Sequence, residues 1–310
     1  DKGISEVLSS AQFINGPAVK KFQSNLESYL GVKHVIPCAN GTDALQVAMM
    51  GLGLKPGDEV ITADFTYAST VEVIALLGLT PVLVDVDIDT FNINPQAIEK
   101  AITSKTKAIV PVHLFGQPAA MDEILEIAKK YNLYIIEDNA QALGAYFKNK
   151  EGKKIKTGCI GDIGTTSFFP SKNLGCYGDG GAIFTNNDEL AHLIRGIANH
   201  GMYKRYYHDV VGVNSRLDSI QAVILNEKLK LLDTYNEKRR TSADIYTSFF
   251  KNNPKIITPK VVGDRNSHVF HQYTLRIINS DRDALSEYLT SNKIPFGIYY
   301  PVPLHLQKAY

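Results

Sequence analysis

Short apolar runs alternate with amphipathic segments through most of the chain. The runs are rich in Val, Ile and Leu, and they predict buried strands over 34–39, 59–64, 80–87, 107–116 and 133–141. Apolar residues at helical spacing lie between and after them and predict helices over 20–30, 40–53, 66–77, 95–102, 121–131 and 188–198. This alternation predicts an α/β fold with a mostly parallel central sheet and helices on both faces.

The pattern changes in the last third of the chain. A long amphipathic helix is predicted over 219–250, which could break near Tyr235. Short strand-like runs and one further helix follow it, over 255–259, 271–278, 282–292 and 296–303. We therefore expect a large domain over 1–230 and a smaller α+β domain over 231–310. Both ends of the sequence look trimmed, so we expect terminal elements beyond them.

Composition narrows the class of protein. The 310 residues are 44% hydrophobic and 21% charged, which is ordinary for a soluble globular protein. A net charge of +1 gives no case for binding nucleic acid or a membrane surface, and no apolar run approaches the roughly 20 residues that span a bilayer. The cysteines, Cys38, Cys159 and Cys176, are widely spaced and lack a metal-binding spacing. We expect a cytoplasmic protein without a metal site.

Polar residues gather where the predicted strands end. In parallel sheets, ligands collect at the carboxyl ends of the strands. Those ends carry 40–42, 64–67, 113–117 and 138–141. The helix start at 40–42, with free backbone N–H groups and the helix dipole, could bind a phosphate, or it could be an ordinary capped turn.

Three charged residues raise a chemical question. Glu137 and Asp138 follow an apolar run, and one of them should point inward, where a carboxylate needs a cationic or hydrogen-bonding partner. The alternative for Asp138 is a capping role in the following turn. Lys172 lies in a glycine-rich turn between two strand-like runs, 164–169 and 180–185. It could be a solvated loop lysine or a lysine that forms a Schiff base.

Together these features meet the needs of pyridoxal 5′-phosphate (PLP). The cofactor requires a lysine, a carboxylate that keeps its pyridine nitrogen protonated, and backbone N–H groups for its phosphate. It also needs an aromatic face, which Phe65 could provide. An ordinary lysine has a pKa of about 10.4, so the site must also lower the pKa of Lys172.

Several motifs carry a family resemblance over nearly the whole chain, from about Phe13 to Tyr310. They are GPAVKKFQSNLESYLGVKHVIPCANGTDALQVAMMGLGLKPGDEVI, IIEDNAQALGA, GDIGTTSFFPSKNLGCYGDGGAIFT and GVNSRLDSIQAVIL. The sequence resembles the nucleotide-sugar aminotransferases of the DegT/DnrJ/EryC1/StrS family, and the SFFPSKNLGCYGDGGA block is highly specific. The resemblance implies the type I PLP aminotransferase fold and a homodimer with shared active sites.

The same resemblance implies roles for residues around the cofactor. Lys172 would form the Schiff base and move the proton between cofactor and substrate. Asp138 would pair with the pyridinium nitrogen, and Gln141 would lie near the ring hydroxyl. Phe65 would stack on the ring.

Further matches concern the phosphate and the substrate. The phosphate ligands implied by the resemblance are Gly41, Thr42, Ser167 and, from the partner subunit, Asn214. Arg216 would lie near the partner's substrate pocket, although an ion pair with Asp218 or another surface acid is the alternative. The remaining pocket residues implied are Tyr300 and His305.

The activity implied is amino transfer from L-glutamate to a keto-sugar on a nucleoside diphosphate. The two half-reactions would be ping-pong, through pyridoxamine 5′-phosphate. The motifs GVNSRLDSIQAVIL and YYPVPLHLQ most resemble the 3-aminotransferase branch, which acts on dTDP-3-keto-6-deoxyhexoses or on a UDP-linked 3-keto N-acetylglucuronate. The products of that branch feed lipopolysaccharide or other surface glycans.

Three alternatives stay open. One is a C4-specific sugar aminotransferase of the same family. Another is a sugar dehydratase of the same fold, but those relatives lose the lysine, commonly to histidine, so Lys172 argues against it. The third is a non-catalytic regulator or scaffold, which is disfavoured because stability alone requires none of Lys172, Asp138 and Gln141.

Overall fold

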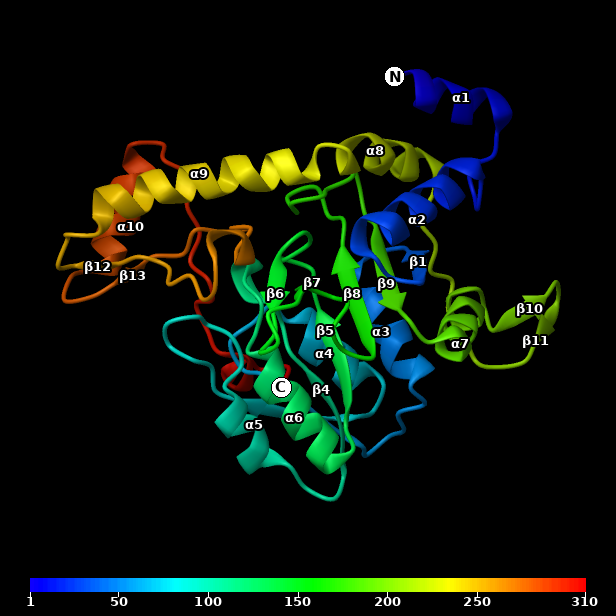
Figure 1. Cartoon of the computed structure of the whole chain (residues 1–310), viewed down its shortest axis with the longest axis horizontal. Coiled ribbons are helices and arrows are strands. Elements are labelled where there is room, and N and C mark those ends of the chain that lie inside the picture. Colours follow the sequence, from blue (N-terminus) through cyan, green and yellow to red (C-terminus); the bar gives the residue numbers. More distant parts are fainter.

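A seven-stranded sheet forms the centre of the computed structural model, which describes all 310 residues (Figure 1). Its order is β1-β9-β8-β5-β4-β2-β3. The strands are β1 (His34–Cys38), β2 (Glu59–Ala63), β3 (Thr80–Val84), β4 (Thr106–Val110), β5 (Tyr134–Asp138), β8 (Ile163–Ser167) and β9 (Gly181–Thr185). Only β9 runs antiparallel to its neighbours, so the predicted mostly parallel α/β sheet is confirmed.

Helices cover both faces of the sheet, as predicted. One face packs against α3 (Gly41–Gly51), α4 (Ser69–Leu76) and α7 (Asp188–Ala198). The other face packs against α5 (Pro95–Ala101) and α6 (Met121–Tyr131) over β2 to β5, and against α2 (Pro17–Leu30) near β1 and β9. A further helix, α1 (Lys2–Ser10), contacts α8 (Ser219–Leu229).

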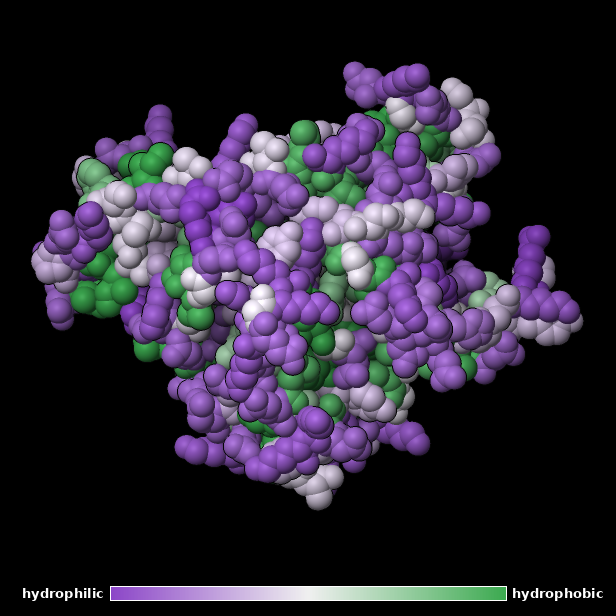
Figure 2. Space-filling model, viewed as in Figure 1, coloured by the Kyte–Doolittle hydropathy of each residue, from purple (hydrophilic) through white to green (hydrophobic).

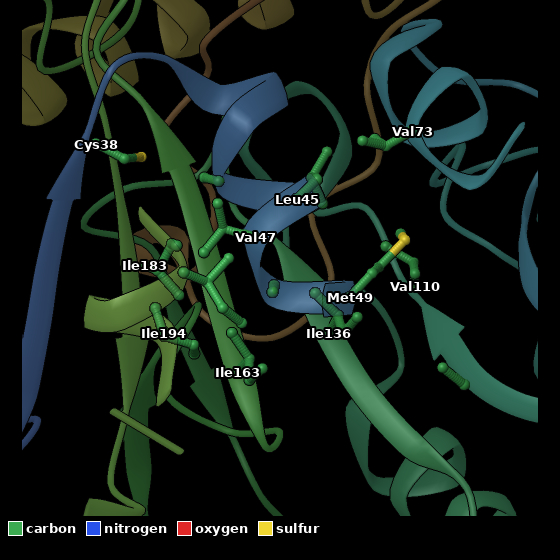
Figure 3. Packing of buried hydrophobic residues seen from close by; sticks show 14 of the residues in the cluster. Cys38, Leu45, Val47, Met49, Val73, Val110, Ile136, Ile163, Ile183 and Ile194 are labelled. Atoms are coloured by element: carbon green, nitrogen blue, oxygen red, sulfur yellow. The ribbon is translucent and has the colours of Figure 1, made fainter. Parts of the chain in front are cut away.

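The apolar strands contribute side chains to both faces of the sheet, because successive side chains of a strand point to opposite faces. In β5, Ile136 faces α3 and Ile135 faces α6, and both are almost completely buried. Figure 3 shows the α3 side, where Leu45 and Met49 pack among side chains of the sheet, including Ile136 and Ile183. This two-sided burial explains why the strands carry continuous rather than alternating apolar residues.

The predicted strand over 107–116 ends early. After β4 the chain continues through Pro111, which has no N–H for a further ladder bond, and turns at His113 into a short 3-10 helix, η1 (Leu114–Gly116). Similarly, β5 ends at Asp138 and α4 begins at Ser69, each leaving a longer loop than predicted. These loops all lie at the carboxyl edge of the sheet.

Two hairpins are additional to the predicted elements. The first pairs β6 (Tyr146–Lys148) with β7 (Lys154–Lys156), and the second pairs β10 (Met202–Lys204) with β11 (Tyr207–His208). Their strands are two or three residues long, which is too short to show an apolar period. The strands of the second hairpin are mostly exposed, whereas β6 and β7 are mostly half-buried. The second hairpin projects from the body of the molecule beside α7 (Figure 1).

The long helix predicted over 219–250 consists of two helices. The first, α8, ends at Leu229, and α9 (Leu232–Phe250) begins three residues later. The break therefore lies before Tyr235, between the buried side chains of Leu229 and Leu232. It falls at the predicted domain boundary, although the division into 1–230 and 231–310 stays a prediction.

The segment after α9 packs more loosely. It holds β12 (Ile256–Ile257), η2 (Arg265–Ser267), β13 (Arg276–Ile277), α10 (Arg282–Ser291) and η3 (Leu304–Leu306). The expected strand over 296–303 is absent, and α10 buries none of its residues. Apolar atoms gather on the surface near the end of α9, at the left of Figure 2, where Phe249 is 80% exposed.

Three further observations concern membrane-spanning helices, metal sites and the cysteines. No helix is both long and apolar enough to cross a membrane. Nowhere do three or more His, Cys, Asp or Glu side chains group in a way that could hold a metal ion. Cys38 and Cys176 are buried and Cys159 is half-buried, and all are free thiols.

Candidate functional site

The pairing of the strands gathers the predicted site residues at one edge. Cys38 at the end of β1 lies opposite Gly181, the first residue of β9, and Gly181 lies opposite Ser167 at the end of β8. On the other side of β8, Thr165 lies opposite Asp138 at the end of β5. The start of α3, the end of β5 and the loop that carries Lys172 therefore share the carboxyl edge.

The start of α3 leaves backbone donors available. Asn40 caps the helix by accepting a hydrogen bond from the Asp43 N–H at 2.8 Å, whereas the amides of Gly41 and Thr42 have no acceptor within the chain. A Cβ on Gly41 would lie 2.7 Å from Cβ of Ser167, so glycine is needed for this close approach. The Thr42 hydroxyl donates to the Ser69 hydroxyl at 3.1 Å. Unpaired N–H groups at a helix N-terminus suit a phosphate.

Asp138 is buried and bonded on both oxygens. One oxygen accepts from the Thr70 hydroxyl at 2.9 Å, and the other accepts from the Ala140 N–H at 3.1 Å. The bond to the Ala140 N–H caps the turn after β5, which is the alternative role that the sequence suggested for Asp138. Capping therefore accounts for one of the two hydrogen bonds of this carboxylate. Thr70 is a site residue that sequence reasoning missed, and its only signal was a polar residue in the apolar pattern of 66–77.

Lys172 is half-buried rather than a solvated surface lysine. Burial lowers the pKa of its ammonium group, and the nearby carboxylate of Asp138 partly opposes that shift. A cavity of about 620 Å³ opens beside it towards α9, and none of the lining residues is acidic. The cationic side chains that line the cavity are Lys172, Lys228, Lys238 and Arg239.

His271 lines the same cavity and shows its electrostatic character. Burial, together with the charges of Lys172 and Arg239, lowers the pKa of His271 to about 3. Its Nδ1 atom is buried without a hydrogen-bond partner. The cavity therefore disfavours a further positive charge and suits an anionic ligand.

Aromatic side chains form a wall on the other side of the edge. The ring of Phe65 stacks on Phe91 with centroids 5.6 Å apart and meets Tyr300 edge-on at 5.5 Å. Gln141 accepts a hydrogen bond from the Phe115 N–H at 2.6 Å and donates to the Tyr300 hydroxyl at 3.3 Å. Burial raises the pKa of Tyr300 to about 12, so this hydroxyl keeps its proton.

The C-terminal segment reaches the same edge through His305. Its backbone N–H donates to a carboxylate oxygen of Asp64 at 2.9 Å, and its ring Nδ1 hydrogen-bonds the other oxygen. Asp64 follows β2 and directly precedes Phe65. Tyr300 and His305, which lie far from Phe65 in sequence, are thus both brought next to it.

Asn214 and Arg216 differ from the other predicted residues. Between them, Ser215 anchors the segment to α3, accepting from the Ala39 N–H at 3.1 Å and donating to Asp43 at 2.7 Å. The side chains of Asn214 and Arg216 have no hydrogen-bond or ion-pair partner in the chain. The ion pair between Arg216 and Asp218 is absent, since Asp218 caps α8 by accepting from the Gln221 N–H at 2.8 Å.

Known proteins resemble this chain over its whole length. The model of the DegT/DnrJ/EryC1/StrS aminotransferase family matches residues 1–310. The UDP-2-acetamido-2-deoxy-3-oxo-D-glucuronate aminotransferase of Pseudomonas aeruginosa is 49% identical, over 100% of this chain and 84% of its own length. The pleiotropic regulatory protein of Geobacillus stearothermophilus is 48% identical, over 99% of this chain and 81% of its own length.

A solved structure shows the same fold. NtdA from Bacillus subtilis, described with bound cofactor PMP, matches with a TM-score of 0.91 and 35% identity. The match covers 99% of this chain and 69% of that one. The family match also confirms the resemblance found in the sequence motifs. The chain therefore belongs to the DegT/DnrJ/EryC1/StrS aminotransferase family and is a transaminase of the PLP-dependent, type I fold.

Proposed function

We propose that this protein transfers the amino group of L-glutamate to the C3 keto carbon of a nucleotide-linked keto-sugar. The substrate would be a dTDP-3-keto-6-deoxyhexose or a UDP-linked 3-keto N-acetylglucuronate. The observation that carries the proposal is the half-buried Lys172 at the carboxyl edge of the sheet, with the carboxylate of Asp138 near enough to affect its pKa. The 49% identical relative named for a UDP-linked 3-oxo sugar supports the choice of substrate class.

The residues at this edge fit PLP. The unpaired amides of Gly41 and Thr42, with the Ser167 hydroxyl beside them, would hold the phosphate. A carboxylate buried like that of Asp138 gains from a cationic partner, and the pyridinium nitrogen would be that partner. Phe65 would cover one face of the ring.

Gln141 would hold the ring hydroxyl from the same edge. Its carbonyl is already occupied by the Phe115 N–H, so its amide NH₂ group is the part that faces Tyr300. An NH₂ group is a donor, and a deprotonated ring oxygen is an acceptor. This orientation supports the role proposed for Gln141.

Proton transfer would be the task of Lys172. When bound, PLP supplies an electron sink that stabilises negative charge on the carbon that loses a proton. Because burial lowers the pKa of Lys172, its neutral amine is present nearer to neutral pH than that of an exposed lysine. The neutral amine can take a proton from the substrate carbon and return one.

The charges around Lys172 suit the two substrates. L-Glutamate carries two carboxylates, and a nucleotide-linked sugar carries a diphosphate. The cavity beside Lys172 contains Lys228, Lys238 and Arg239 and no acidic residue, which would favour such anions. Tyr300 and His305 would then contact the sugar from the other side.

We also propose that the active protein is a homodimer with shared sites. Asn214 is exposed, and neither its side chain nor that of Arg216 has a partner in its own chain. Asn214 would reach the phosphate in the partner subunit's site, and Arg216 would lie near the substrate there. In the same proposal, residues 1–230 form the cofactor-binding domain and residues 231–310 form a smaller one.

One relative supports a second candidate. The 48% identical protein of Geobacillus stearothermophilus is named as a regulatory protein rather than an enzyme. A non-catalytic regulator would have no use for an amine with a lowered pKa at Lys172. Enzymatic assay of the purified protein separates the two functions.

The buried amine should leave a signature in the stability of the cofactor-free protein. Lys172→Met should raise the melting temperature at neutral pH, because it removes an ammonium that burial disfavours. The folded-state pKa of Lys172 lies below the ordinary value of about 10.4. The native protein therefore loses this penalty as the pH rises from the folded-state pKa to about 10.4. The advantage of the variant should therefore shrink towards pH of about 10.

Calorimetry over that pH range measures the difference. Lys153→Met, which removes an exposed lysine, is the matched control and should give no such gain. A gain for Lys172→Met that stays constant or grows with pH would contradict the argument.

The activity is tested with L-glutamate and a panel of dTDP- and UDP-linked 3- and 4-keto sugars. The 3-keto sugars should be converted to amino sugars with release of 2-oxoglutarate, and 4-keto sugars should react at least about tenfold more slowly. Lys172→Ala should lower turnover on the order of a thousandfold by removing the acid–base group. Turnover of 4-keto sugars alone would favour the C4-specific alternative, and no turnover of any sugar would favour the regulator.

Shared sites predict complementation between inactive variants. An equal mixture of Lys172→Ala and Asn214→Ala subunits should recover about a quarter of wild-type activity, since half of the dimers are mixed and each has one intact site. Lys172→Ala mixed with Asp138→Ala is the control. Each site takes both Lys172 and Asp138 from the same subunit. A mixed dimer therefore lacks one of these residues in each of its two sites and has no intact site. Equal recovery in both mixtures, or none in the first, would contradict shared sites.

A further inference from the structure

A fully buried, hydrogen-bonded pair of ionisable side chains lies on the side of β5 opposite Asp138. Because strand side chains alternate, Glu137 points away from the face that holds Asp138. Its Oε2 lies 2.8 Å from Nε2 of His113, and both side chains are 0% exposed. Burying such a pair is costly unless its remaining hydrogen bonds are satisfied, so its bonds indicate what it holds in place.

Glu137 is satisfied by backbone donors. Besides His113, it accepts hydrogen bonds from the N–H groups of Gly158, Ile160 and Gly161 at 2.8, 2.6 and 2.7 Å. Each carboxylate oxygen thus receives two donors. The backbone of the loop before β8 therefore holds this carboxylate in place. As a result, His113 has a fixed hydrogen-bond partner.

The imidazole of His113 closes the turn that follows β4. Its Nδ1 accepts a hydrogen bond from the Ala119 N–H at 3.1 Å, so the proton lies on Nε2 and is donated to Glu137. One ring therefore ties residue 119 back to residue 113 and ties both to β5. The turn between them includes Gly116, whose φ angle of 105° glycine adopts readily, and Phe115, whose φ angle of 57° needs such external support.

This turn contacts the cofactor edge through its backbone. The Phe115 N–H donates to Oε1 of Gln141 at 2.6 Å, which leaves the Gln141 NH₂ group to face Tyr300. The Gly116 carbonyl accepts from the Val269 N–H at 2.9 Å, which joins the turn to the C-terminal segment. The turn thus fixes which end of the Gln141 amide faces the site.

We propose that His113 and Glu137 are positioning residues, which hold the 113–119 turn so that the Phe115 amide orients the Gln141 side chain towards the cofactor. The inference rests on the proposed function, because Gln141 is assigned to the cofactor ring there. Neither residue touches the site itself. An apolar pair of similar size would fill the same space at lower desolvation cost, but it would not fix the turn by hydrogen bonds.

The test compares variants of the cofactor-loaded protein. His113→Phe removes both ring hydrogen bonds, whereas His113→Gln keeps one donor and one acceptor. Thr185→Val removes a buried hydroxyl bonded to the Asp162 carbonyl at 2.9 Å, at the end of β9 away from the site, and serves as the matched control. If His113→Phe does not fold, His113→Asn replaces it, since it keeps an acceptor for Ala119 but cannot reach Glu137.

Three quantities are measured for each variant: the melting temperature, the dissociation constant of PLP, and the pH midpoint of the cofactor's absorbance titration. His113→Phe should weaken PLP binding about tenfold, the size of one lost buried hydrogen bond, and should shift the titration midpoint. His113→Gln should restore most of both. Thr185→Val should lower the melting temperature without moving either cofactor readout.

A double variant tests the route through Gln141. If the pair acts through that side chain, adding His113→Phe to Gln141→Leu should change PLP binding and the titration midpoint no further than Gln141→Leu alone. Additive effects, or a His113→Phe protein with unchanged cofactor readouts, would overturn the inference. Failure of the wild-type protein to bind PLP would instead overturn the proposed function, so the two failures are distinct.

Discussion

The half-buried amine of Lys172 is the constraint around which the site is built. Burial disfavours its charged form, while the carboxylate of Asp138 favours it, and the balance lowers the pKa of the ammonium group. Holding both groups at the edge of an apolar sheet costs stability, so their neighbours supply hydrogen bonds. Thr70 and Ala140 bond Asp138, and the turn around Lys172 is closed by its own N–H to the Phe169 carbonyl at 2.8 Å.

The topology makes this arrangement possible. Because β9 runs antiparallel to β8, the connection between them is a loop at the carboxyl edge instead of a helical crossover. That loop carries Lys172, and it begins at Ser167, next to the start of α3. Gly181 permits the closest approach, since a Cβ there would lie 2.4 Å from the Asn40 carbonyl oxygen. One reversed strand therefore brings the lysine to the helix start that suits a phosphate.

The sequence was sufficient for elements whose burial is regular. Amphipathic helices such as α6 and α7 match their predicted ranges, because burial on one side gives a clear apolar period. The Val- and Ile-rich strands overlap their predicted ranges, but β4 and β5 end earlier than predicted. The hairpins β6–β7 and β10–β11 lack that signal because their strands are only two or three residues long. Contacts between distant segments, such as Asp64 with His305 or Thr70 with Asp138, also leave no local pattern. His113 and Glu137 were visible as polar residues at strand ends, but only the structure shows that they bond to each other.

The proposed chemistry depends on Lys172 as the residue to which the cofactor attaches. Borohydride reduction of the PLP-loaded protein, followed by peptide mass spectrometry, tests it most directly. We expect a stable cofactor adduct on the peptide that contains Lys172, and none elsewhere. An adduct on Lys228 or Lys238 in the neighbouring cavity, or no adduct on a protein that binds PLP, would contradict it.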